Sequence, residues 1–229
     1  MDKHPVNPLE ALEEVLKFFG DIGVTELAAP VPLPDSSPSP KSIHEEYGIL
    51  CRGILQCRKC RLSRSRTQAV PGEGNLSSDL MFVGEGPGRD EDIQGRPFVG
   101  EAGRLLSRII KAMTFTREDV YITNIVKCRP PRNRDPQPDE IEMCQGYLFQ
   151  QIGMIQPKVI VTLGNVPTRF FLKTTAGITS LRGSFHSFGN IKIMPTFHPS
   201  YLIRRRGDLE IKREVWQDMQ KVMTFLGKK

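Results

Sequence analysis

Short apolar runs alternate with amphipathic stretches along most of the chain. Runs rich in β-branched residues and bounded by glycine or polar turns predict buried strands at 79–84, 120–126, 158–164 and 191–197. Apolar residues at helical spacing predict helices at 100–113, 138–155, 166–172 and 208–226. Strands that alternate with helices predict an α/β fold whose mostly parallel sheet is covered on both faces. In such folds the chemistry lies beyond the carboxyl ends of the strands.

The first 41 residues differ in composition from the rest. Residues 8–19 predict an amphipathic helix, because apolar side chains recur at helical spacing with glutamates opposite. The Pro- and Ser-rich stretch that follows cannot build a core and predicts a linker. We therefore expect residues 1–41 to form an acidic helix plus linker, and residues 42–229 to form the main domain. The helix is faintly similar to a sliding-clamp-binding peptide but lacks its glutamine, which favours a plain amphipathic helix.

Charge is unevenly distributed along the chain. The formal net charge is +6, yet residues 1–48 carry three Lys or Arg against nine Asp or Glu, which leaves +12 for the remainder. A basic domain behind an acidic leader favours a polyanionic partner over a merely solvated surface. No stretch is apolar enough for a membrane helix, and the N-terminus lacks a signal-peptide pattern. We therefore expect a cytoplasmic protein without a membrane partner.

Four of the five cysteines are candidate metal ligands. Cys57 and Cys60 form a Cys-x-x-Cys pair, and Cys128 and Cys144 follow far downstream, each pair with basic neighbours. Thiols in a cytosolic protein remain available to bind metals, since disulfides are rare there. This spacing is compatible with zinc and with an iron–sulfur cluster alike. We interpret the fifth, Cys51, as an inert thiol.

A glycine-rich loop follows the first predicted strand. Its sequence, Gly84-Glu-Gly-Pro-Gly, is typical of a phosphate cradle or of a simple tight turn. It lacks the Lys-Ser/Thr pair of a nucleotide-triphosphate loop, and the acidic run 90–92 would repel phosphate. The loop therefore favours a neutral ligand, with Phe98 either as a stacking surface or as an ordinary core aromatic.

Two further polar residues stand out, one within a predicted strand and one just after another. Asn124 lies among apolar residues, so its amide either reads a ligand edge or is satisfied by nearby backbone. His198 opens the run His-Pro-Ser-Tyr-Leu-Ile-Arg-Arg-Arg after the last strand. A single histidine is more often structural, but one that leads into apolar groups and three arginines suits insertion into DNA.

Together these segments resemble the family 4 uracil-DNA glycosylases, the iron–sulfur type, from about Glu45 to the C-terminal helix. The similarity covers the loop Gly-Glu-Gly-Pro-Gly with its downstream Gly-Arg-Pro-Phe-Val-Gly, then Tyr-Ile-Thr-Asn-Ile-Val-Lys-Cys-Arg-Pro-Pro, then His-Pro-x-Tyr-Leu-x-Arg, and all four cysteines in order. One motif is moderate evidence, but the ordered set is highly specific. The resemblance implies a three-layer α/β/α fold with a central four-stranded parallel sheet. It also implies a [4Fe–4S] cluster, which decides between iron and zinc.

The resemblance implies roles for individual residues. Uracil would stack on Phe98, Asn124 would hydrogen-bond the uracil edge, and His198 would stabilise the departing base. The residues expected to surround the base also include Gly84, Glu85, Gly86, Pro87, Gly88 and Glu91. The water-orienting Asp of many superfamily relatives is absent, which leaves Glu85, Glu91 and Asn124 as candidates. We expect His198, Asn124 and Glu85 to be catalytic. Contacts with DNA are expected from Asn133, Ser200, Tyr201, Leu202 and Arg204.

The expected function is that of a monomeric, nucleoid-associated DNA-repair enzyme. It would flip uracil out of duplex or single-stranded DNA and hydrolyse its N-glycosidic bond. Residues 129–138 contain no histidine, so we do not expect the covalent trapping seen in some relatives. Two alternatives stay open. One is a non-catalytic iron–sulfur protein that binds uracil-containing or single-stranded DNA, and the other is a redox sensor.

Overall fold

The computed structural model describes residues 40–228, so the predicted helix at 8–19 and its clamp-like segment lie outside the described residues. The helices are α2 (Pro40–Gln56), α3 (Arg89–Gln94), α4 (Glu101–Ala112), α5 (Pro138–Ile155), α6 (Asn165–Leu172), α7 (Ile178–Leu181), α8 (Pro199–Arg204) and α9 (Leu209–Phe225), with 3-10 turns η1 (Arg61–Arg64) and η2 (Pro131–Asn133). The strands are β1 (Glu73–Gly74), β2 (Leu80–Gly84), β3 (Tyr121–Asn124), β4 (Val159–Leu163), β5 (His186–Phe188) and β6 (Ile191–Thr196). Between residues 40 and 228, no helix has the length and apolar character needed to cross a membrane.

The strands form one mixed sheet in the order β1-β3-β2-β4-β6-β5. The four central strands are parallel to one another, whereas β1 and β5 pair antiparallel at the two edges. The predicted parallel sheet is confirmed, but the expected total of four strands is wrong. Both edge strands were missed because two or three residues are too few to show an alternating pattern, and their side chains are at most half-buried.

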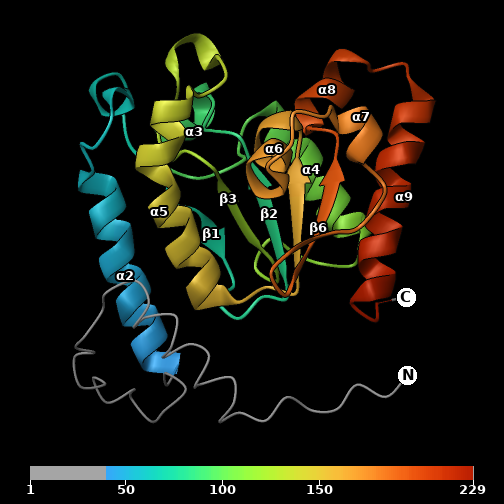
Figure 1. The fold of residues 1–229 in the computed structure, drawn as a ribbon, viewed down its shortest axis with the longest axis horizontal. Coiled ribbons are helices and arrows are strands. Elements are labelled where there is room, and N and C mark those ends of the chain that lie inside the picture. The colour runs from blue at the N-terminus through green and yellow to red at the C-terminus, as the bar shows by residue number, and fades with distance from the viewer. Residues whose placement is uncertain (1–39, 229) are drawn as a thin grey trace, which may run out of the picture. The chain divides into compact units, whose positions relative to one another are not determined.

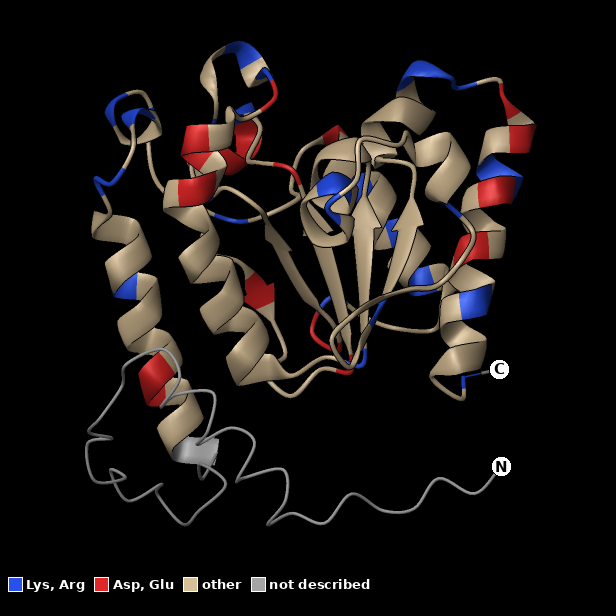
Figure 2. Ribbon diagram, in the orientation of Figure 1, with Lys and Arg blue, Asp and Glu red and all other residues tan. Residues whose placement is uncertain are grey.

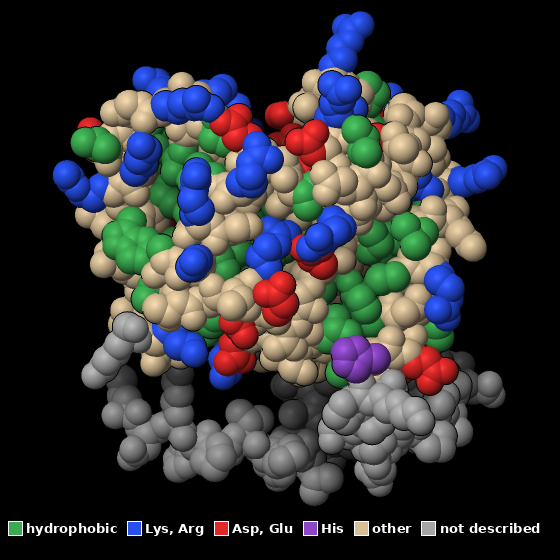
Figure 3. Space-filling model, turned by 180° about the vertical axis from the view of Figure 1, so that it is seen from behind, with side chains coloured by type: hydrophobic (Ala, Val, Ile, Leu, Met, Phe, Trp, Pro, Cys, Tyr) green, Lys and Arg blue, Asp and Glu red, His purple; other side chains and the backbone are tan. Residues whose placement is uncertain are grey.

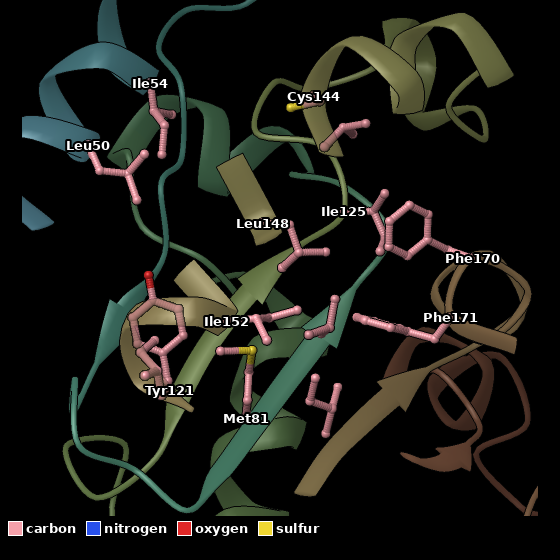
Figure 4. Close-up of a cluster of buried hydrophobic side chains, with 14 of the residues drawn as sticks. Leu50, Ile54, Met81, Tyr121, Ile125, Cys144, Leu148, Ile152, Phe170 and Phe171 are labelled. Atoms are coloured by element: carbon pink, nitrogen blue, oxygen red, sulfur yellow. The ribbon is translucent and has the colours of Figure 1, made fainter. Parts of the chain in front are cut away.

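Side chains of the central strands alternate between two cores. Met81 and Val83 of β2 pack with α2, α5 and α6, whereas Leu80 and Phe82 pack with α4 and α9. Figure 1 shows α2 and α5 on one side of the sheet and α9 on the other. Figure 4 shows the first core, in which side chains of α2, α5 and α6 converge on the strands. The three-layer architecture is therefore confirmed, and it directs the loops after the parallel strands to one edge.

A buried ion pair anchors the end of β6 to α9. The carboxylate of Asp218 has no exposed surface and accepts hydrogen bonds from Arg182 at 2.6 and 3.2 Å. Thr196, the last residue of β6, donates to the same carboxylate at 2.7 Å. Because His198 follows two residues later, this network also sets where the loop after β6 begins.

Replacement of Asp218 by alanine should therefore destabilise the protein strongly. The variant leaves the buried Arg182 guanidinium with one of its two carboxylate partners, Glu214 at 2.9 Å, and removes the acceptor of the Thr196 hydroxyl. The loss should therefore be about 3 kcal/mol, the lower end of the range for breaking a buried ion pair. Asp79→Ala provides the control, because Asp79 pairs with Lys158 where both side chains are more than half exposed, and such pairs contribute about 1 kcal/mol or less. Urea unfolding measures both free energies. Equal losses in the two variants would contradict the structural role of Asp218.

Candidate active site

A cavity of about 670 Å³ lies at the carboxyl ends of the four parallel strands. Glu85 follows β2, Asn124 ends β3, Leu163 ends β4 and His198 lies just after β6, and all four residues line the cavity. Ligands of open α/β sheets bind at this edge. Sequence reasoning found three of these strand ends and missed the one at β4. The sequence did contain a signal for this strand end, because the predicted strand 158–164 ends in Gly164 just as the predicted strand 79–84 ends in Gly84.

Most of the predicted site residues line this cavity. They are Glu85, Gly86, Pro87, Gly88, Glu91, Phe98, Asn124, Asn133, His198, Ser200, Tyr201 and Arg204. Leu202 does not, because α8 turns its side chain toward α9, where it is 5% exposed and packs with Phe197 and Ile211. The lining residues that were missed include Arg134, Asp135, Asn165 and Thr179.

Asn124 presents an unsatisfied amide to the cavity. Its side chain is buried, and its Oδ1 is the one buried side-chain polar atom without a hydrogen-bond partner among residues 40–228. Its backbone is fixed by the buried Lys127, whose Nζ donates to the Asn124 carbonyl at 2.8 Å and to Thr123 Oγ1 at 2.6 Å. An unsatisfied buried acceptor costs about 1–3 kcal/mol, so it indicates a ligand donor at this point.

Gly84 allows two functional side chains to meet. A Cβ atom at this position would lie 2.4 Å from Asn124 Oδ1 and 2.5 Å from Phe98 Cζ. Neither approach is sterically tolerable, so any larger residue would displace the amide or the ring. Gly84 therefore shapes the cavity from beneath without lining it.

Phe98 lies in the cavity wall on a strained backbone. Its φ of +52° is in the left-handed region, which is unfavourable for an aromatic residue. Its ring lies 5.9 Å from the His198 ring between centroids, at an angle of 35°. The loop around it is held by Glu91, whose carboxylate accepts from the backbone N–H groups of Val99 and Gly100 at 2.9 Å each. Glu91 is thus committed to holding the loop.

His198 is held as a neutral imidazole with one defined tautomer. Its Nδ1 accepts from the Ser200 backbone N–H at 3.1 Å and lies 2.7 Å from Ser200 Oγ. Nδ1 therefore carries no proton, which leaves Nε2–H as the donor. Burial, and next the positive charge of Arg204, lower the pKa of His198 to about 4. The close approach of β4 depends on Gly164, where a Cβ atom would lie 3.1 Å from His198 Cβ.

Glu85 is the carboxyl group in the cavity that titrates near neutral pH. Burial, followed by repulsion from and hydrogen bonding with Asp135, raises the pKa of Glu85 to about 7. Both side chains line the cavity. A carboxyl group with this pKa exists in both protonation states under physiological conditions, as a general base or water-orienting group requires.

The four predicted ligand cysteines lie around a second, smaller cavity. Its lining includes Cys57, Cys60, Cys128 and Cys144, whereas Cys51 lies outside it. All five thiols are free. Within residues 40–228, no three His, Cys, Asp or Glu side chains are spaced as ligands of a single metal ion. Cys57 and Cys60 lie in the segment between α2 and η1, Cys128 lies in the loop after β3, and Cys144 lies on α5.

Several N–H groups point at these sulfur atoms. Arg66 Nη1 donates to Cys128 Sγ at 2.9 Å, and the Lys127 backbone N–H donates to Cys144 Sγ at 3.3 Å. Burial raises the pKa of Cys128 and raises that of Cys144 to about 11, while these donors oppose that effect and favour the thiolate, which is the metal-binding form. The donor set therefore fits a thiolate-bound centre.

A buried glutamate ties the cysteine segments together. Glu140 accepts from Arg61, the residue after Cys60, at 2.8 Å, and from Arg134 at 2.7 Å. The hydrogen bonds from Arg134, with those of the Gln137 backbone and Arg61, outweigh burial and lower the pKa of Glu140 to about 2. Since Cys144 lies one helical turn later on α5, this clamp fixes two of the cysteine-bearing segments relative to each other.

Basic residues surround the mouth of the larger cavity. Figure 2 shows Lys and Arg in the loops at the end toward which the strands point, with acidic residues on α3 and at the start of α5 nearby. In Figure 3 the upper rim is hollowed, with basic side chains on both sides and acidic ones in the hollow. Such a rim suits a polyanion, while the hollow itself does not suit a phosphate.

Several known proteins are similar in sequence to this chain over most of its length. The sequence model of the Uracil DNA glycosylase superfamily matches residues 71–220. A Type-4 uracil-DNA glycosylase of Thermotoga maritima is 47% identical over 79% of this chain and 94% of its own. The chain belongs to the type-4 uracil-DNA glycosylase family. Another member, from Archaeoglobus fulgidus, is 41% identical over 81% of this chain and 96% of its own. A Type-5 uracil-DNA glycosylase of Pyrobaculum aerophilum is only 30% identical, over 62% of this chain and 70% of its own.

The raised pKa of Glu85 predicts a pH-dependent cost in stability. Because the pKa is higher in the folded protein than in the unfolded chain, the contribution of Glu85 to stability is most favourable below about pH 4.5 and is lost as the pH rises through about 7. Glu85→Gln should therefore raise the melting temperature at pH 8 more than at pH 4. Thermal unfolding at both pH values, with exposed Glu142→Gln as control, measures this. A pH-independent difference for Glu85→Gln would show that Glu85 ionises normally.

Proposed function

We propose that this protein hydrolyses the N-glycosidic bond of uracil in DNA and leaves an abasic site. The observation that carries the proposal is the unsatisfied Oδ1 of Asn124 in a cavity shared with the Phe98 ring and a neutral His198. Relatives that align with most of this chain are named uracil-DNA glycosylases, which supports the same reaction.

Uracil is recognised by its edge and its face. The Oδ1 of Asn124 accepts from the N3–H of uracil, and its amide nitrogen donates to O4. Cytosine presents an acceptor at N3 and a donor at N4, so it would leave the buried amide with mismatched partners. Such a mismatch in a dry site is strongly discriminating. Stacking on Phe98 adds affinity for the flat ring.

His198 makes the base a better leaving group. As the N-glycosidic bond breaks, its electron pair passes into the pyrimidine and the sugar becomes oxocarbenium-like. The Nε2–H of neutral His198 donates to O2, where negative charge develops. A fixed donor of this kind is worth about 3–4 kcal/mol in other enzymes. The fixed tautomer supports this role, because the accepting nitrogen is already committed to Ser200.

Glu85 is the residue best suited to orient the attacking water. Of the three candidates, Glu91 is committed to backbone N–H groups and Asn124 is required for the uracil edge. Glu85 lines the cavity, and its pKa of about 7 leaves a carboxylate available at neutral pH. Water adds to C1′ of the sugar and its proton passes to the carboxylate, which completes the hydrolysis.

The base reaches the cavity only after it is flipped out of the helix, which costs roughly a few kcal/mol. Tyr201 and Arg204 line the mouth and are suited to occupy the vacated space and to contact phosphate. Asn133, on the opposite side, accepts from Arg129 at 2.7 Å and fixes that guanidinium in the same rim. Leu202 is left out of this set because it is buried.

We further propose that the four cysteines around the smaller cavity hold a [4Fe–4S] cluster. Their origin in three separate segments and the N–H donors to sulfur support this assignment. The bound cluster would supply a covalent cross-link between the segment before η1, the loop after β3, and α5. It would thus support the basic rim and the end of β3 without entering the hydrolysis.

His198→Ala should lower the rate of uracil excision about 100- to 1,000-fold, because one oxyanion donor is lost. The affinity for uracil-containing duplex DNA should change little, since the rim contacts remain. The rate is measured under single-turnover conditions with end-labelled DNA, because alkali converts each abasic site formed into a strand break. Fluorescence anisotropy gives the affinity. His186→Ala is the matched control, because that ring bonds the Leu181 carbonyl outside the cavity.

Equal losses of rate and affinity in His198→Ala would contradict the leaving-group role. Wild-type protein that binds uracil-containing DNA tightly but never releases the base would reject the enzyme assignment itself. That outcome would identify a non-catalytic DNA-binding protein instead.

Cys144→Ser should reduce the iron and acid-labile sulfide content of anaerobically purified protein and weaken its visible absorption. Cys51→Ser should leave all three unchanged, because Cys51 lies outside the ligand cavity. Elemental analysis together with the absorption spectrum makes the comparison. Stoichiometric zinc in the wild type, or full iron content in Cys144→Ser, would contradict the assignment.

A further inference from the structure

We infer that Arg117, a residue outside the cavity, is a positioning residue that holds Phe98 in place for stacking. Arg117 lies between α4 and β3 and does not line the cavity. The inference rests on the proposed function only in that Phe98 stacks on the base. Nothing in the sequence motifs distinguishes this arginine from a solvated surface charge.

The guanidinium of Arg117 is largely buried and fully engaged. Its Nη2 donates to the Pro97 carbonyl at 2.7 Å, and its Nη1 donates to the Phe98 carbonyl and to Ser107 Oγ, both at 3.1 Å. Its Nε and Nη2 also donate to Glu73 on β1, at 3.1 and 2.5 Å. The side chain is 18% exposed. The planar guanidinium of Arg117 therefore links the edge strand β1, helix α4, and the carbonyls of Pro97 and Phe98.

The Phe98 backbone requires such support. A left-handed φ costs about 1–3 kcal/mol for a residue with a side chain and persists only where its surroundings impose it. Three groups impose it here. Glu91 holds the N–H groups that follow Phe98, and Gly103 leaves the space, since a Cβ atom there would lie 1.9 Å from the Phe98 carbonyl oxygen. Arg117 holds the carbonyls on the other side.

The charge on Glu73 fits this arrangement. Burial alone would raise the pKa of Glu73, but hydrogen bonds from Arg96 and Arg117 together lower it, so the carboxylate stays ionised beside the guanidinium. Arg96 is 61% exposed, and among the described residues its side-chain hydrogen bonds go to Glu73. Arg96 precedes Phe98 in the same loop and shares the carboxylate of Glu73 with Arg117, but the Pro97 and Phe98 carbonyls accept from Arg117 and not from Arg96.

That difference supplies a matched pair of variants. Arg117→Gln should lower kcat for uracil excision at saturating DNA by about tenfold or more, a coupling of ordinary size for residues in contact. Arg96→Gln should stay within about twofold of wild type. The KM for DNA should change little in both, because the rim is untouched. The kcat of Glu73→Gln should lie between those of the two arginine variants, since this variant removes the charge that holds the Arg117 guanidinium.

A double-mutant cycle separates positioning from general damage. In a Phe98→Ala background, Arg117→Gln should cause little further loss of kcat, because the ring that it positions is already absent. An equal loss in both backgrounds, or wild-type kcat in Arg117→Gln, would overturn the inference.

A spectroscopic measurement tests the same point without activity. Trp216 is the single tryptophan of the chain, so F98W in a W216F background reports on position 98 alone. Arg117→Gln should increase acrylamide quenching of that indole, whereas Arg96→Gln should not. If the wild type excised no uracil, the proposed function would fail while this comparison still decided the role of Arg117. Identical quenching in the two variants would overturn it.

Discussion

The absence of a side chain at Gly84 is the constraint on which the cavity depends. The end of β2 passes directly beneath the place where the Asn124 amide and the Phe98 ring meet, with room for a hydrogen atom only. Neighbouring parallel strands bring Gly84 and Asn124 into register, and the loop after α3 returns Phe98 over them. One position on the innermost part of the sheet thus controls both the hydrogen-bonding and the stacking surface.

The fold could be predicted from the sequence where patterns were long. The four parallel strands are apolar runs, and helices such as α5 have a long apolar periodicity. Their existence and approximate boundaries were therefore predictable. The edge strands β1 and β5 were not, because their pairing is imposed by neighbours that arrive from elsewhere in the chain. Sheet width is a tertiary property that short local sequences do not encode.

The candidate site was predictable where motifs carried it and not where contacts did. Asn124 stands out as a polar residue within a strand, Phe98 as an aromatic residue in the glycine-rich loop and His198 as a polar residue just after a strand, and all three line the same cavity. Three contacts that shape the site join residues far apart in sequence: Glu85 with Asp135, Arg61 with Glu140, and Arg117 with the Pro97 carbonyl. Leu202 was predicted to contact DNA because its motif follows a strand like a loop, but the structure places it in a buried apolar cluster.

The locked imidazole has a consequence for the fate of the product. Because Nδ1 of His198 is occupied by Ser200 and the ring resists protonation until about pH 4, it has no spare proton to transfer. In the proposed reaction the excised pyrimidine therefore departs from the sugar still negatively charged. Until it takes up a proton from solvent, the two arginines that line the cavity, Arg134 and Arg204, would attract the freed anion and slow its escape.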